Sequence, residues 1–169
     1  MKMSIVMAAV FLFGNSLLFS QSEEKKDIST TSACTDLDFL LGDWQISNQA
    51  GTISATATVQ AGPNHCYLTQ TSKTSRFDFL CLTAYSNTSH DWHMLCGSSN
   101  GGRPFYSNGV RHGDEVSFMV DDAKDPTVHH RFSFSRLPDG NVRDAQQSSN
   151  DNGRTWSKPD AGMIWKQKK

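Results

Sequence analysis

The sequence has almost no net charge, and it lacks the residue patterns of nucleic-acid and metal sites. Its 16 lysines and arginines nearly balance its 17 aspartates and glutamates. It contains no basic run with interleaved aromatic residues, which argues against a nucleic-acid partner. The four cysteines include no pair at the C-x2–4-C spacing of a zinc knuckle, and the six histidines show no H-E-x-x-H spacing. We therefore expect no nucleic-acid partner and no metal site.

A long apolar run occurs only at the N-terminus. It extends from Met3 to Phe19, follows a lysine and is interrupted by a Gly-Asn-Ser tripeptide. A membrane anchor usually has about 20 uninterrupted apolar residues, whereas a shorter run that ends before a small residue such as Ser20 is typical of a signal peptide. We predict a cleaved signal peptide over residues 1–20, with a membrane anchor as the alternative. The protein is thus expected to be exported, either periplasmic or secreted, and to keep no membrane span after cleavage.

Residues 21–32 and the rest of the chain differ in composition. The segment 21–32 is rich in Ser, Thr, Glu and Lys, and it contains too little apolar surface to offset the entropy lost on ordering, so we predict a flexible leader. Residues 33–169 are enough for a single domain with its own core.

The domain lacks a helical apolar stripe and instead alternates apolar and polar residues. A short stretch at 36–40 is the best candidate for a helical or 3₁₀ turn. Elsewhere the period is two, and clusters of Gly, Pro, Asn and Asp separate the alternating segments. This pattern predicts an all-β fold, an antiparallel meander of about eight to ten strands that closes into a barrel and so protects its edges. The predicted inward series of one strand is Ile53, Ala55, Ala57 and Val59.

The register of one hairpin follows if its tip lies at residues 88–89, because residues equally far from the tip on either side then face each other. This register places Tyr85 opposite Trp92 and Cys81 opposite Cys96. Directly opposed Cβ atoms are about 4.5–5.5 Å apart, close to disulfide reach. The register therefore predicts a Cys81–Cys96 bridge, although a slip of one residue would separate the two cysteines.

The remaining cysteines are Cys34 and Cys66. An even number of cysteines in an exported protein favours disulfides over free thiols, so Cys34 is left to pair with Cys66. Free buried cysteines are the alternative.

A second hairpin turns at Pro138-Asp139-Gly140, where Gly140 can take the left-handed conformation. Its register places three pairs on one face, namely His130–Ser148, Phe132–Gln146 and Phe134–Asp144. The aromatic and polar side chains of this face are candidates to line a binding cavity.

The segment Ser149–Trp156 matches S-x-D-x-G-x-T-W, the Asp-box of sialidase propellers. In such a turn the aspartate accepts amide hydrogens, the glycine takes a positive φ and the tryptophan folds over the turn. We predict structural roles for Asp151, Gly153 and Trp156. A single copy cannot build a propeller, which argues against a sialidase.

The segment Gly97–Gly101 fits the G-x-S-x-G pattern of hydrolases. A nucleophile elbow needs a strand, a sharp turn and a helix in front of a large α/β sheet, whereas this segment is a Gly/Ser loop between predicted strands. We expect no catalytic residues.

Gly42 and Trp44 form a G-x-W motif similar to the signature of lipocalins and other calycins, in which the tryptophan plugs the closed end of the barrel. Together with four later segments, it makes the chain from about Cys34 onward resemble an uncharacterised family of small bacterial lipocalin-like barrels. The motif lies in D-F-x-L-G-D-W at 38–44, and the four later segments are Gly62–Cys66, the Tyr85…Trp92-His93 hairpin, Leu137–Arg143 and Ser149–Trp156. The resemblance implies this fold and a Cys34–Cys66 bridge, but no activity. The chain departs from the family in Leu40 and in its second cysteine pair.

These features predict a non-enzymatic barrel that binds a small apolar or amphipathic molecule in its interior. The predicted ligand-binding residues are His130, Phe132, Phe134, Asp144, Gln146, Tyr85 and Trp92. No cofactor is expected. Haem held by His130 is a minor alternative, against the ordinary role of a hydrogen-bonded core histidine. The competing hypotheses are a protein-binding barrel with a solid interior and, third, an enzyme.

Overall fold

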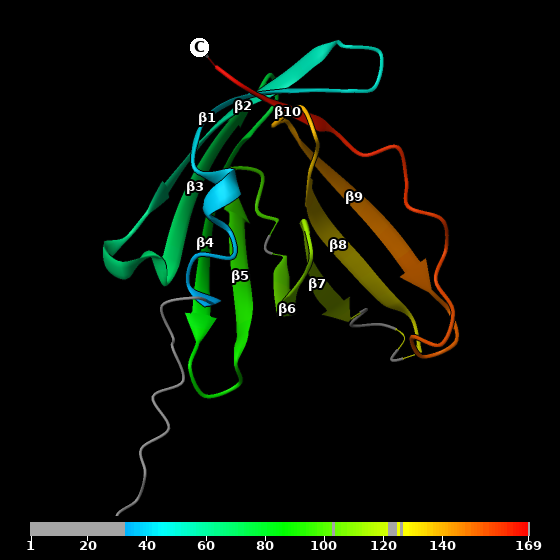
Figure 1. The fold of residues 1–169 in the computed structure, drawn as a ribbon. Helices are drawn as coiled ribbons and strands as arrows, with labels where there is room; N and C mark the ends of the chain where they lie inside the picture. The colour runs from blue at the N-terminus through cyan, green and yellow to red at the C-terminus, as the bar shows by residue number, and fades with distance from the viewer. Residues whose placement is uncertain (1–32, 103, 122–124, 126, 169) are drawn as a thin grey trace, which may run out of the picture.

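The computed structural model describes residues 33–102, 104–121, 125 and 127–168 (Figure 1). The predicted signal peptide (1–20) and leader (21–32) lie outside these residues. In the described ranges no helix is long and apolar enough to cross a membrane.

The described residues form ten strands and two short 3₁₀ turns. In chain order the elements are η1 (Asp38–Leu40), β1 (Gly42–Ser47), β2 (Ile53–Ala61), η2 (Pro63–His65), β3 (Tyr67–Thr74), β4 (Asp78–Ser86), β5 (Asp91–Ser98), β6 (Phe105–His112), β7 (Glu115–Asp121), β8 (His129–Arg136), β9 (Val142–Ser149) and β10 (Ile164–Gln167).

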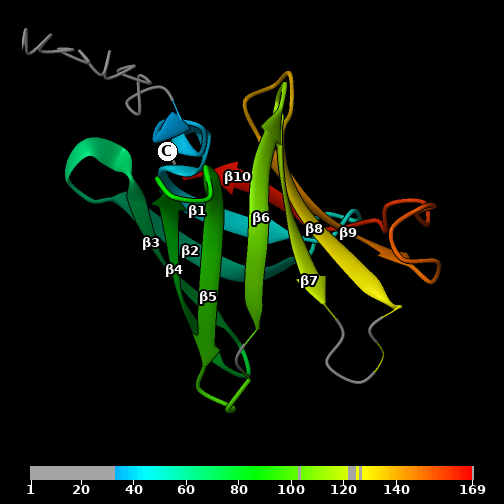
Figure 2. The same ribbon diagram turned by 90° about the horizontal axis from the view of Figure 1, so that it is seen from below.

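The strands form one antiparallel meander that closes into a barrel. Each strand pairs with its neighbours in sequence, and β10 pairs with β1, for example at Trp165 and Ile46. Figure 2 shows β3 to β9 following one another around the barrel. This architecture confirms the predicted all-β meander. Its weakest contact is between β9 and β10, which share only the pairs Ile164–Arg143 and Trp165–Val142.

Both predicted hairpin registers are confirmed. Cys81 lies opposite Cys96 and Tyr85 opposite Trp92 in the β4–β5 pair. In the β8–β9 pair the observed partners are the three predicted ones, His130–Ser148, Phe132–Gln146 and Phe134–Asp144.

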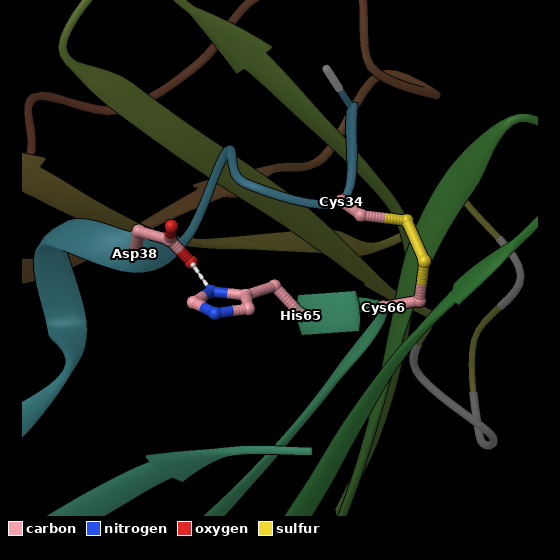
Figure 3. The surroundings of a disulfide bond; sticks show 4 residues. All are labelled: Cys34, Asp38, His65 and Cys66. Atoms are coloured by element: carbon pink, nitrogen blue, oxygen red, sulfur yellow. Dashed lines mark hydrogen bonds and ion pairs between the residues drawn. A yellow bond between two sulfur atoms is a disulfide. The ribbon is translucent and has the colours of Figure 1, made fainter. Parts of the chain in front are cut away.

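Both predicted disulfides are present, Cys34–Cys66 and Cys81–Cys96. The Cys34–Cys66 bridge ties the segment before β1 to the β2–β3 connection (Figure 3). Close to it, Nδ1 of His65 lies 2.8 Å from Oδ1 of Asp38, so a second contact joins the same two segments.

The two ends of the barrel differ. One end carries η1 together with the β2–β3, β4–β5, β6–β7 and β8–β9 turns, and here Leu37, Leu40 and Trp44 are buried in the core. Trp44 donates a hydrogen bond from Nε1 to the carbonyl oxygen of Leu40, 2.7 Å away, and so joins β1 to η1. We call this the closed end. The opposite end, with the β1–β2, β3–β4, β5–β6, β7–β8 and β9–β10 connections, is called the open end.

The predicted inward series of β2 is wrong at its first residue. Ala55 faces the interior, and Ala57 and Val59 are buried, but Ile53 is 57% exposed. The reason is a β-bulge, because Ile46 pairs with Ala55 whereas the next residue, Ser47, pairs with Ile53. The bulge adds one residue, Ser54, to β2, so the side chain of Ile53 points to the outer face instead of the inner one.

Candidate ligand-binding cavity

The open half of the barrel contains a cavity of about 430 Å³. It is lined by side chains from the parts of the strands nearest the open end and by the irregular segment before β10. The lining residues are Ile46, Ala55, Gln70, Ser72, Thr74, Phe79, Cys81, Met94, Cys96, Pro104, Tyr106, Phe132, Phe134, Asp144, Gln146, Asp160, Gly162, Met163 and Trp165. Most of these side chains are apolar or aromatic, which is the usual composition of a small-molecule site.

Four aromatic residues form a continuous wall. The ring centroids are 5.5 Å apart for Tyr106 and Phe132, 4.8 Å for Phe132 and Phe134, and 5.4 Å for Phe134 and Trp165. Trp165 also contacts Trp44, at 6.3 Å, with the rings edge to face. The wall therefore reaches from the cavity to the buried tryptophan of the closed end, and the rings hold one another in place.

Asp144, on β9, is the polar centre of the cavity. Its Oδ1 accepts a hydrogen bond from the backbone N–H of Met163 (2.8 Å) and its Oδ2 one from Nε1 of Trp165 (2.9 Å). Burial raises the pKa of Asp144 above its usual value, and the negative charge of Asp160 adds to this effect, although the two hydrogen bonds oppose it. The two hydrogen bonds therefore hold the carboxylate in place, but no positively charged side chain among the described lining residues balances its charge.

The segment between β9 and β10 brings a second carboxylate to the cavity. Asp160 lies along the edge of β9, where its N–H donates to the carbonyl of Gln146 (2.9 Å) and its Oδ1 accepts from the N–H of Gln146 (2.8 Å). The same segment stays close to β9 as far as Gly162, whose φ is +61°. A Cβ atom there would lie 1.8 Å from the carbonyl oxygen of Asp144, so only glycine allows the backbones to lie this close.

Tyr106 faces the same region from β6. Burial raises the pKa of the Tyr106 hydroxyl, and the charge of Asp144 raises it further. The hydroxyl therefore stays protonated at neutral pH and can donate a hydrogen bond to a ligand.

Four of the seven predicted ligand-binding residues line this cavity, namely Phe132, Phe134, Asp144 and Gln146. His130 lies instead in a neighbouring depression of about 240 Å³, which it shares with Tyr106 and Arg131. Tyr85 and Trp92 contact each other at 5.5 Å near the β4–β5 turn, at the closed end and outside the cavity.

Sequence reasoning missed Tyr106, Asp160 and Trp165. Tyr106 lies in β6, whose pairing with both neighbours shifts in register. Asp160 lies outside any strand, and Trp165 belongs to a strand of four residues. Period-two alternation cannot identify inward-facing residues in such segments.

The Asp-box turn follows β9, at the open end. Asp151 accepts hydrogen bonds from the N–H and the hydroxyl of Thr155 and from the hydroxyl of Ser149. The hydroxyl of Thr155, followed by its amide and then by Ser149, lowers the pKa of Asp151 to about 2. Gly153 has a φ of +78°, and the Trp156 ring lies 4.7 Å from the guanidinium carbon of Arg131. The turn lies outside the cavity lining.

The closed ten-strand antiparallel meander is consistent with a calycin-like barrel. No protein-family model matches this sequence, and a search of curated proteins finds no significant match.

Proposed function

We propose that this protein is an exported, lipocalin-like barrel that binds one small apolar or amphipathic molecule in the cavity of its open half. The cavity itself is the observation that carries the proposal. Its volume of about 430 Å³ lies within the range of roughly 300–1,000 Å³ for small-molecule sites. The aromatic wall would bind the apolar part of the ligand, and Asp144, Gln146 and Tyr106 would orient its polar part.

The contrast between the two ends also supports a binding role. The closed end is filled by large side chains such as Trp44, Trp92 and Phe118, each at most 1% exposed. The open half is lined but not filled. The competing hypothesis, a protein-binding barrel with a solid interior, gives no account of this volume.

We further propose that the protein binds without catalysing a reaction. Asp144 already accepts two hydrogen bonds from the protein, and no histidine is present among the described residues that line the cavity. Ser98 of the G-x-S-x-G loop donates its hydroxyl to Oδ1 of Asn100 in the β5–β6 turn. It therefore has a local capping role instead of the activated position of a nucleophile.

Export is the remaining part of the proposal. The two disulfides are compatible with an oxidising compartment, and the predicted signal peptide gives the route. Intact-mass measurement of the exported protein should give a chain that starts near Gln21. Retention of Met1 would contradict cleavage.

Binding can be tested with a neutral fluorescent probe, N-phenyl-1-naphthylamine, whose emission rises in an apolar site. We expect saturable 1:1 binding to the mature, disulfide-bonded protein. Ala55→Phe, which adds a ring inside the cavity, should abolish it. Thr56→Phe adds the same ring on the outer face of the same strand and should leave it unchanged, with circular dichroism confirming that both variants fold.

The wild-type titration decides this proposal. If neither this neutral probe nor a charged apolar probe binds, the interior is not a ligand site. Equal binding by wild type and a folded Ala55→Phe variant would place the probe elsewhere on the molecule. Where the probe binds in the cavity, native mass spectrometry of protein purified from its own host would identify the natural ligand as a co-purifying small molecule.

A further inference from the structure

The cavity carries negative charge without a balancing positive charge from the protein. Of the described residues that line it, Asp144 and Asp160 are acidic and none is a lysine, arginine or histidine. The two carboxylates are close enough for the charge of Asp160 to affect the titration of Asp144. Asp144 is half-buried beside the apolar wall, whereas Asp160 is exposed at the rim of the cavity. Their like charges repel each other, so a cation placed between them would stabilise both.

Both carboxylates can accept further hydrogen bonds. Each oxygen of Asp144 accepts one hydrogen bond from the protein, and a carboxylate offers about four acceptor positions. Oδ1 of Asp160 accepts one from Gln146, whereas its Oδ2 has no hydrogen-bond donor among the described residues. These unused lone pairs leave the carboxylate charge open to a cation from outside the protein, whether or not that cation carries N–H groups.

The aromatic wall beside these carboxylates is a second, independent observation. The rings of Tyr106, Phe132 and Phe134 lie in series on the side of the cavity from which Asp144 projects. Aromatic faces attract organic cations, most strongly where water is excluded. An anionic or neutral ligand would gain nothing comparable from this combination of rings and carboxylates.

We propose that the ligand is a cationic amphiphile, an organic amine or quaternary ammonium compound, with its positive group between Asp144 and Asp160 and its apolar body along the aromatic wall. This inference rests on the proposed function and narrows it to one chemical class. Gln146 and the Tyr106 hydroxyl border the same site and would bind any polar substituent next to the cationic group.

The test uses three probes that share a phenylbutyl body and differ in charge: 4-phenylbutyltrimethylammonium, 4-phenylbutanol and 4-phenylbutyrate. Titration calorimetry on the mature, disulfide-bonded protein at pH 7 measures each affinity. We expect the ammonium to bind about tenfold more tightly than the alcohol, a difference that corresponds to about 1.4 kcal/mol. The carboxylate should bind most weakly.

Two variants locate the effect. Asp160→Asn removes one charge while its side-chain oxygen can still accept from Gln146, and it should weaken ammonium binding about threefold to tenfold without changing alcohol binding. Asp144→Asn should weaken it at least as much. Asp114→Asn, in the β6–β7 turn of the closed end, removes the same charge far from the cavity and should have no effect. If Asp144→Asn does not fold, Asp160→Asn decides alone.

The outcomes separate this inference from the proposed function. Equal affinities for the ammonium and the alcohol, or unchanged ammonium binding in a folded Asp160→Asn variant, would overturn the cationic ligand while leaving a binding barrel. Binding of the neutral fluorescent probe without binding of the ammonium would do the same. Failure of all three phenylbutyl probes and of the fluorescent probe would instead overturn the proposed function itself.

Discussion

Trp44 and Trp92 provide a matched pair for measuring what holds the closed end together. Each indole is 1% exposed and belongs to the same buried core. They differ in their polar atom. Nε1 of Trp44 donates to the carbonyl of Leu40 at 2.7 Å, whereas Nε1 of Trp92 has no hydrogen-bond partner among the described residues. Replacing each by phenylalanine removes a similar volume but only one hydrogen bond.

The expected magnitudes follow from this difference. Removing part of a buried aromatic side chain leaves a cavity in both variants, so the packing loss should be similar. Trp44→Phe also leaves the buried carbonyl of Leu40 without its donor, which costs about 1–3 kcal/mol. Trp92→Phe removes a donor that is already unsatisfied, and this change is neutral or favourable. We therefore expect Trp44→Phe to be less stable than Trp92→Phe by about 2 kcal/mol.

Urea unfolding of both variants with the disulfides intact, followed by tryptophan fluorescence, gives the two free energies of unfolding. Equal m-values are needed, because they show that the same surface is exposed in each case. Equal stabilities, or a less stable Trp92→Phe, would refute the assignment of Trp44 as the hydrogen-bonded plug that joins β1 to η1. Titration of the fluorescent probe against Trp92→Phe tests Trp92 as a ligand residue, since a core residue of the closed end should change stability and leave probe binding intact.

Three further predictions follow from the same structure. The Cys34–Cys66 bridge closes a longer loop than the β4–β5 bridge, with sequence separations of 32 and 15. In urea unfolding, replacing its two cysteines by alanine should therefore cost more, by roughly 0.7 kcal/mol in the chain-entropy model. The pKa of Asp151 is lowered to about 2, so its contribution to stability is present above its unfolded pKa of about 3.9 and is lost as the pH falls through about 2. The gap in melting temperature between wild type and Asp151→Asn should accordingly close on acidification. Finally, the raised pKa of Asp144 means that its carboxylate gains a proton at a higher pH than an ordinary aspartate does. Calorimetry should show the affinity for the permanently charged ammonium probe falling as the pH drops from 7. Tyr106, which also faces Asp144, has a raised pKa and stays protonated over this range, so it does not contribute to the change.

The predicted parts of the fold are those set by local chemistry. The Cys81–Cys96 and Phe134–Asp144 pairs could be read from the sequence because a short turn fixes the register on both sides of it. The facing of Ile53 could not, because Ser54 forms a bulge that depends on how β2 meets β1. For the same reason the side chain of Tyr106 could not be assigned to the interior.

The position of Trp92 illustrates a different limit. Its partner across the hairpin was predicted, but the barrel end on which the hairpin turns was not. That choice depends on the whole meander, because the turns of an antiparallel barrel alternate between its two ends. The N-terminal segment covers the end with the β4–β5 turn and buries Leu37 and Leu40 there, so Trp92 becomes part of the core instead of the cavity.

The contact between β9 and β10 explains why the cavity lies where the sequence pattern is weakest. A β10 as long as β9 would place every second side chain inward along this side and fill the open half. The chain instead pairs only two residues of β10 with β9, and between Asp160 and Met163 it hydrogen-bonds to β9 only at these two residues, with a glycine between them. This irregular contact leaves space inside the barrel, and it brings backbone and carboxylate groups, instead of a regular strand, to the surface of that space. Of the two acidic residues that would select a ligand, Asp144 is placed by the regular β8–β9 register, whereas Asp160 is placed by this interruption of the ladder, which period-two alternation cannot reveal.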